Sequence, residues 1–263
     1  MPTVHVNDID LYYEVHGKGP AVVFCHGAGG NHLSWWQQVP AFRDRYRCIT
    51  FDHRAFGRSH DTNGAGRQWF ARDVEALLGH LGIDSCAVVA QSMGGRTAIG
   101  VAFRTSIKVW ALVFSGTNGG AVTDEVRAIQ EAHRRSLPPG STLLDRALAP
   151  AFVAERPDLA FLYREIQRMN PPRPSDFLAP IPGYHGSTAE RLAESGIPVL
   201  FLAGAEDQVV PADAIEACHR AVPGSRFVRI AGAGHSAYFE KPAEFNRAVV
   251  AFLDEVAPRA RPL

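Results

Sequence analysis

A single serine separates an apolar run from two glycines in the stretch VVAQSMGGRTA, residues 88–98. Serine is a good helix-capping residue, but capping does not explain the small residues Ala90 and Gly94, two positions before and after Ser92. Small residues there let a strand and the next helix approach closely around a tight, strained turn that exposes the serine hydroxyl. The stretch therefore predicts either a helix cap or a nucleophilic serine at a strand-to-helix turn.

A nucleophilic serine needs two partners, and the chain supplies both further along. A serine hydroxyl attacks poorly until a neutral imidazole accepts its proton, and the imidazole needs a carboxylate that fixes its tautomer and stabilises its charged form. Asp207 and His235 follow Ser92 in the order serine, acid, histidine. We interpret Ser92 as the nucleophile, His235 as the general base and then acid, and Asp207 as the acid that orients the histidine.

These three side chains can meet only if the elements that carry them return to one edge of a sheet. Apolar, strand-like runs alternate with helix-length segments, a pattern typical of a parallel sheet covered on both faces in an α/β fold. Ligands bind at the carboxyl ends of the strands in such sheets. The predicted strands are residues 3–6, 10–16, 21–25, 48–51, 86–90, 110–114, 198–203 and 227–230. The predicted helices include residues 34–45, 67–81, 94–103, 124–135, 212–222 and 242–256.

The alternation stops after the sixth predicted strand. Residues 122–185 predict helices but no strand, and Ser187–Glu190 matches a capping box that opens the next helix. A helix that begins at Pro157 has an apolar stripe too extensive to face water, which consists of Leu159, Leu162, Tyr163, Ile166 and Met169. We therefore expect a helical cap, residues 122–185, over a core of residues 1–121 and 186–263. The cap is expected to cover the edge above Ser92 and to set substrate choice.

Composition excludes several classes of function. The chain has 27 basic and 27 acidic residues, so it lacks the positive charge that drives binding to nucleic acid or to an anionic membrane. The N-terminal sequence shows no secretory signal, and no apolar run reaches the roughly 20 residues of a membrane helix. The four cysteines form no C-x-x-C pair and the histidines no H-E-x-x-H motif. We expect buried reduced thiols, no bound metal and a cytoplasmic location.

Five short motifs occur in a familiar order. They are HGAGG at 26–30, DHRAFGRS at 52–59, AQSMGG at 90–95, GAEDQVVP at 204–211 and GAGHSAYFEKP at 232–242. Together they resemble the alpha/beta-hydrolase family, of the capped, single-domain serine esterase or lactonase type. Two residues depart from the family pattern, since Ala90 and Ala55 each stand where a glycine is usual. Serine rather than aspartate at position 92 argues against the dehalogenase and epoxide hydrolase branches.

The resemblance also implies how a developing negative charge would be stabilised. The geometry of the strand-to-helix turn makes the backbone N–H of Met93 one donor of an oxyanion hole, and the resemblance places the second donor at Ala28. A plain glycine-rich turn or a phosphate-binding loop is the alternative for HGAGG, although the stretch lacks the glycine-lysine pair of a P-loop. The match G-x-x-D-x-x-x-P over 204–211 favours Asp207 over its neighbour Glu206 as the acid.

The predicted function is a serine hydrolase without a cofactor. It would cleave a carboxylic ester or lactone of a small, largely apolar substrate through an acyl-enzyme. Thioesters, carbon–carbon cleavage of ketonic substrates, and a ligand receptor that retains the fold are alternatives. His32, Trp35, Tyr163 and Tyr184 are candidate substrate contacts. A small molecule is the only partner expected, and the oligomeric state is left open.

Overall fold

The computed structural model describes residues 2–143, 145–179 and 188–258. Within them, one eight-stranded sheet has the order β1-β2-β4-β3-β5-β6-β7-β8. The strands are β1 Thr3–Val6, β2 Ile9–His16, β3 Ala21–Cys25, β4 Arg47–Phe51, β5 Ser85–Gln91, β6 Lys108–Ser115, β7 Val199–Gly204 and β8 Arg226–Ile230. The pairs β1–β2 and β2–β4 are antiparallel, and the remaining pairs are parallel. The predicted α/β fold with a mostly parallel sheet is confirmed.

The strand order places two predicted site loops side by side. β4 lies on one side of β3 and β5 lies on the other. The order in which successive strands are added to the sheet therefore reverses between β3 and β5. Open α/β sheets bind ligands at such a switch point, beyond the carboxyl ends of the strands. Ala28 follows β3 and Ser92 follows β5, so both residues come to this point of the sheet.

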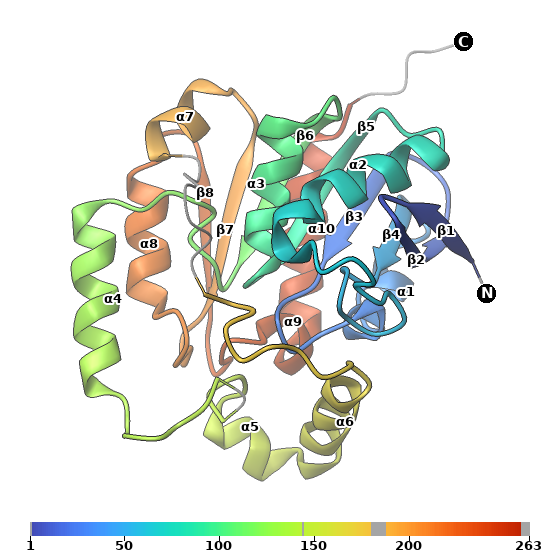
Figure 1. Cartoon of the computed structure of the whole chain (residues 1–263). Helices are drawn as coiled ribbons and strands as arrows, with labels where there is room; N and C mark the ends of the chain where they lie inside the picture. Colours follow the sequence, from blue (N-terminus) through green and yellow to red (C-terminus); the bar gives the residue numbers. More distant parts are fainter. Residues whose placement is uncertain (1, 144, 180–187, 259–263) are drawn as a thin grey trace.

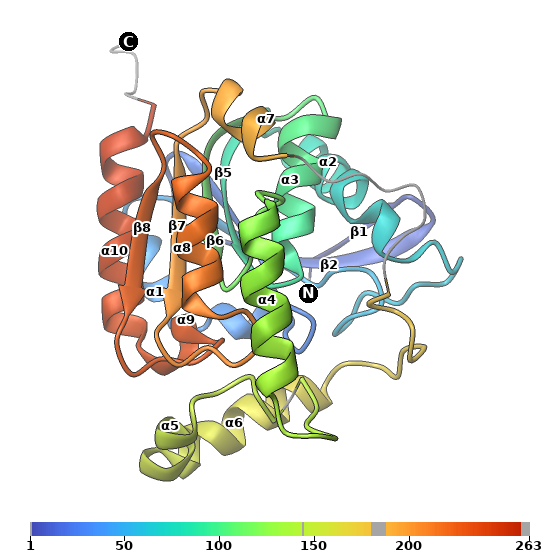
Figure 2. The same ribbon diagram turned by 90° about the vertical axis from the view of Figure 1, so that its left-hand side faces the viewer.

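Helices cover both faces of the sheet (Figures 1 and 2). On β3, Val23 and Cys25 pack into one core with α2, α3, α7 and α8, whereas Val22 and Phe24 pack into the other with α1 and α10. This division follows from the strand geometry, because successive side chains point to opposite faces. The helices are η1 His32–Trp35, α1 Val39–Phe42, η2 Gly66–Trp69, α2 Phe70–His80, α3 Gly94–Arg104, α4 Asp124–Ser136, α5 Pro150–Glu155, α6 Pro157–Arg168, α7 Ala189–Glu194, α8 Ala212–Arg220, α9 Ala237–Glu240 and α10 Pro242–Val256.

Three local predictions need correction. The helix expected over residues 34–45 is two short pieces, η1 and α1, and Pro40 occupies the first turn of the second piece, where its missing N–H is not needed. The short helix α5 was not predicted. The capping residue of α7 is Thr188, whose side chain accepts from the N–H of Arg191, one position later than the predicted box, and Ser187 lies outside the described residues.

The apolar stripe of α6 is buried only in part. Tyr163 and Ile166 are buried, but Leu162 and Met169 are 37% and 49% exposed, so the expectation that the whole stripe is covered was wrong. α6 packs on η1 and α5, and this contact reaches one side of the helix only. Leu162 and Met169 lie outside it.

The described residues between β6 and β7 contain α4 to α7 and no strand. α4 packs on α8, while α5 and α6 lie beyond the end of the sheet where α9 also lies (Figures 1 and 2). Among the described helices, none has both the length and the apolarity required to cross a membrane. The four cysteines are buried free thiols.

Candidate active site

Ser92 occupies a strained turn between β5 and α3. Its φ is +49°, in the left-handed region that costs an L-residue about 1–2 kcal/mol. Its N–H donates to the carbonyl oxygen of Ser115 at 2.9 Å, which fixes the turn to the end of β6. Met93, not Ser92, is the capping residue of α3, and that cap has no side-chain hydrogen bond. Of the two interpretations of this stretch, the geometry favours the sharp strand-to-helix turn.

Gly94 allows the turn to be this tight. A Cβ at this position would lie 2.2 Å from the carbonyl oxygen of Cys25 at the end of β3, a distance that no real Cβ contact tolerates. The first turn of α3 can therefore lie directly against β3 only because residue 94 has no side chain. This is the physical reason for the small residue that the sequence shows two positions after Ser92.

His235 and Asp207 form a buried hydrogen-bonded pair. His235 Nδ1 lies 2.8 Å from Asp207 Oδ2, and the two side chains are 4% and 0% exposed. The second carboxylate oxygen accepts from the N–H groups of Val209 and Val210 at 2.7 and 2.9 Å. Because a carboxylate only accepts, Nδ1 carries the proton and the lone pair of a neutral ring is on Nε2. His235 Nε2 is buried and has no hydrogen-bond partner among the described residues.

Neighbouring loops hold this pair close to the turn at Ser92. Gln91, the residue before Ser92, donates from Nε2 to the carbonyl oxygen of His235 at 3.3 Å. A Cβ on Gly116 would lie 3.0 Å from His235 Nδ1, so the loop after β6 packs directly on the imidazole. His133 of α4 bonds the carbonyl oxygen of Gln208 at 3.0 Å, next to Asp207. Loops after β5, β6, β7 and β8 therefore converge on one place.

A cavity of about 630 Å³ opens at Ser92, and Ala28 and Met93 line it together with the serine. In the part of the chain that the structure describes, the backbone N–H groups of Ala28 and Met93 donate no hydrogen bond. Both predicted oxyanion donors therefore lie beside the serine at one cavity.

The segment between β6 and β7 contributes Val122, Arg127, Leu143 and Leu178 to the cavity lining. The cap was expected to cover the edge above Ser92 with the apolar stripe of α6, but Leu159, Leu162, Tyr163 and Ile166 of this stripe do not line the cavity in the described structure. α6 instead packs on η1.

Of the four candidate substrate contacts, the three that the structure describes do not line this cavity. Trp35 is fully buried between Phe24 and Tyr238, with ring centroids 5.2 and 4.9 Å away. The hydroxyl of Tyr163 lies 2.7 Å from Ser236 Oγ, and burial raises the pKa of this phenol to about 12. His32 is held by Asp52, as described next. Tyr184 lies outside the described residues.

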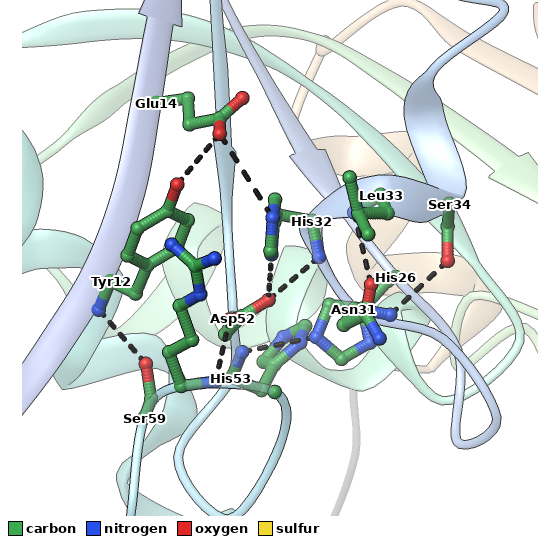
Figure 3. Close-up of polar contacts among 12 residues, drawn as sticks. Tyr12, Glu14, His26, Asn31, His32, Leu33, Ser34, Asp52, His53 and Ser59 are labelled. Carbon is green, nitrogen blue, oxygen red and sulfur yellow. Dashed lines mark hydrogen bonds and ion pairs between the residues drawn. The ribbon is translucent and has the colours of Figure 1, made fainter. Parts of the chain in front are cut away.

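Figure 3 shows the polar contacts that fix the loop carrying Ala28. Asp52 Oδ1 accepts from the N–H and from Nδ1 of His32, at 2.7 and 2.8 Å, and Oδ2 accepts from the N–H of Arg58 at 2.8 Å. His26 Nδ1 lies 2.8 Å from its neighbouring carbonyl at Gly27, and His26 Nε2 accepts from the N–H of His53 at 3.0 Å. Burial lowers the pKa of His26 to about 4, which keeps Nε2 able to accept. These contacts order the loops around the site.

Sequence reasoning missed several residues around the site. Glu240 accepts from the N–H groups of Ala149, Gly234 and Ser236, so it fixes the backbone on both sides of His235, and burial raises its pKa. It lies within the motif at 232–242, so its position was visible but its contacts were not. Three arginines of the cavity, Arg67, Arg96 and Arg127, were also missed, because they belong to none of the five motifs.

Known proteins resemble this chain over nearly its whole length. A protein of Azorhizobium caulinodans named as a carbamate hydrolase is 28% identical over 267 residues, which cover 97% of this chain and 99% of that protein. The 3-oxoadipate enol-lactonase 2 of Acinetobacter baylyi is 28% identical over 267 residues, with 95% and 96% covered. A thermophilic esterase from Thermogutta terrifontis superimposes with a TM-score of 0.75 and 25% identity, over 95% of each chain.

The family model described as the alpha/beta hydrolase fold matches residues 20–242. This range contains every strand from β3 to β8 and the three predicted reactive residues. The chain belongs to the alpha/beta hydrolase family.

Proposed function

We propose that this protein is a serine hydrolase that cleaves a carboxylic ester or lactone through an acyl-enzyme. The observation that carries the proposal is the convergence of two features at one end of the sheet. A serine in a strained turn opens into a cavity, and a buried histidine whose Nδ1 is bound to a carboxylate lies on a loop tied to the residue before that serine.

In the first half of the proposed reaction, Ser92 Oγ attacks the carbonyl carbon of the ester while His235 Nε2 takes the hydroxyl proton. Asp207 stabilises the imidazolium that forms. The carbonyl oxygen becomes an oxyanion that accepts from the N–H groups of Ala28 and Met93. The tetrahedral intermediate then expels the alkoxide, which takes the proton from His235, and the acyl group remains on Ser92.

Water completes the cycle. His235 Nε2 takes a proton from the water, whose oxygen attacks the acyl carbon. The second tetrahedral intermediate then collapses, the bonding electron pair returns to Ser92 Oγ, and His235 gives its proton to that oxygen. The products are a carboxylic acid and an alcohol, or one hydroxy acid when the substrate is a lactone. The relatives named as an esterase and an enol-lactonase support this choice of bond.

A burst experiment tests the proposal. With a 4-nitrophenyl ester in excess, the wild-type protein should release nitrophenol in a rapid initial burst and then at a slower, steady rate. Folded Ser92→Ala should have a kcat about 1,000-fold or more below that of wild type. Ser106→Ala is the matched control, because Ser106 is an exposed serine that bonds Glu75 and does not line the cavity. Full activity of Ser92→Ala would contradict the proposal. A folded wild type that hydrolyses no ester would favour the ligand-receptor alternative.

We further propose a cytoplasmic location. Reduced, buried thiols are typical of cytosolic proteins, and the free state of all four cysteines supports this location.

A further inference from the structure

The charges that line the cavity are of one sign. Arg67, Arg96 and Arg127 line it, and none of its described lining residues is Asp or Glu. The rest of the lining includes apolar side chains such as Ile99, Val122 and Leu178. A cleft with charges of one sign and low-dielectric walls concentrates its field and attracts ligands of the opposite charge. Its lining therefore suits an anion that has an apolar body.

The three arginines differ in how they are placed. Arg127 is 64% exposed and forms a 2.8 Å ion pair with Asp124 one turn earlier on α4, so its charge is largely compensated at the rim. Arg67 donates to the carbonyl oxygen of Ala179, which fixes its guanidinium group beside Leu178 on the wall of the cavity. Arg67 and Arg96 are both only partly exposed. These two residues are the better anion ligands.

Arg96 lies close to the positive end of a helix. Arg96 lies in the first turn of α3, four residues after Ser92, and this turn contains no acidic residue. The N-terminal end of a helix is electrostatically positive, so a cation there is destabilising and an anion is stabilising. An anion in the cavity would be attracted by both the arginine and the helix terminus. The most positive part of the cavity is therefore adjacent to the proposed nucleophile.

We propose that the substrate carries an ionised carboxylate, a few bonds from the scissile ester or lactone, which Arg96 and Arg67 bind. A guanidinium group pairs with a carboxylate through two parallel hydrogen bonds. Because Arg96 and Ser92 line the same cavity, the contact between the guanidinium group and the carboxylate would also orient the scissile carbonyl for attack. This inference rests on the proposed function, and it replaces the largely apolar substrate expected from sequence with an anionic one.

Two esters that differ by one methyl group, and therefore in charge, test the inference. They are the 4-nitrophenyl monoester of glutaric acid and its methyl ester, 4-nitrophenyl methyl glutarate. Wild type should hydrolyse the acid with at least about 10-fold higher kcat/KM. Arg96→Gln should lower kcat/KM for the acid by about 10- to 100-fold, the range for a hydrogen bond to a charged group, and change the methyl ester by less than about 3-fold. Arg67→Gln should show the same selectivity with a smaller loss.

Arg134→Gln is the matched control, because it removes the same charge from an exposed arginine of α4 that does not line the cavity. It should change both rates by less than about 3-fold, since the charge of an exposed arginine paired with Glu131 is screened by water. A wild type without preference for the acid, or an Arg96→Gln variant that loses both activities equally, would overturn the inference while leaving the proposed hydrolase intact.

A binding measurement separates this inference from the proposed function. Titration of the Ser92→Ala protein with monomethyl glutarate should give a higher affinity than titration with dimethyl glutarate, and the affinity for monomethyl glutarate should fall as salt is added. Adding Arg96→Gln should remove the difference in affinity between the two compounds. This result would support the anion site even if no ester were hydrolysed. Equal affinity for the two compounds would overturn it.

Discussion

Two histidine–aspartate pairs in this molecule have almost the same geometry. His235 and Asp207 are joined by a 2.8 Å contact from Nδ1 to a carboxylate oxygen, and so are His32 and Asp52. In both pairs the histidine side chain is 4% exposed and the aspartate side chain 0% exposed. Distance and burial therefore do not distinguish the proposed base from a structural histidine.

The pairs differ at the second ring nitrogen. His32 Nε2 lies 3.9 Å from Glu14 Oε1, and its ring packs 4.6 Å from Tyr12 (Figure 3). His235 Nε2 has no hydrogen-bond partner among the described residues, and its loop is bonded to the residue before Ser92. The His32–Asp52 pair faces another carboxylate, whereas the His235–Asp207 pair has a ring nitrogen left to accept a proton from a hydroxyl group. The surroundings of Nε2 therefore decide which pair can act as a base.

The largest expected effect separates the two aspartates. Asp207→Asn should lower kcat by about 10⁴-fold, because an amide no longer holds His235 in the tautomer that leaves Nε2 free. Asp52→Asn should reduce stability, since Asp52 accepts three hydrogen bonds, but should change kcat of the folded protein by less than about 10-fold. Ester hydrolysis, with circular dichroism to confirm folding, checks both. Equal losses in kcat would break the distinction between the pairs.

The loops around the His32–Asp52 pair should weaken in acid. Burial lowers the pKa of His26 from 6.5 to about 4, so between these values the unfolded chain binds more protons than the folded protein. His26 then contributes stability that is present above about pH 6.5 and is lost as the pH falls towards 4, an amount of about 3 kcal/mol. Urea denaturation at several pH values measures this loss.

Side-chain NMR provides the control for that prediction. In the folded protein at pH 5.5 the ring of His26 should be neutral, with Nδ1 protonated towards Gly27. A protonated, cationic His26 in folded protein at this pH would contradict the account of the loop contacts.

A smaller effect on stability is expected from substitution of two glycines that follow β4, Gly57 and Gly64. Gly57 and Gly64 have φ values of +47° and +68°, so alanine is strained at both. A Cβ at Gly57 would lie 2.2 Å from Asp52 Oδ2, whereas a Cβ at Gly64 would meet nothing within 4 Å. Gly57→Ala should therefore lower the free energy of unfolding by about 2 kcal/mol more than Gly64→Ala. Equal losses in chemical denaturation would mean that the loop at Asp52 yields easily.

Much of this arrangement could be predicted from sequence, and the reasons are local. Apolar runs and helix periodicity depend on short-range geometry, so the sheet was predicted, as was the strand end that carries each reactive residue. The strain at Ser92 was also predictable, because Gly94 and Ala90 have no other explanation in that stretch. Ala55 is the opposite case. It adopts a φ of +68° although it is not a glycine, at a position where the family usually has glycine.

Contacts between distant segments were not predictable. Nothing in the sequence separates His32 from a substrate ligand, because its neighbours Asp52 and Glu14 come from other strands and loops. The apolar stripe of α6 led to a wrong prediction of the cavity wall for the same reason. Periodicity shows that one face of a helix is apolar, but not which part of the molecule covers that face. Arg67 and Arg96 meet at the cavity only through the fold.

The rate at which a fluorophosphonate labels the protein, followed by mass spectrometry with peptide mapping, tests whether His235 activates Ser92. The probe reacts with a serine whose hydroxyl is activated by a base. We expect labelling at Ser92 in wild type, a rate within about 10-fold of wild type in folded His32→Gln, and a loss of about 1,000-fold or more in folded His235→Gln. Labelling at another serine, or equal rates in the two histidine variants, would contradict the assignment of Ser92 as the nucleophile and His235 as its base.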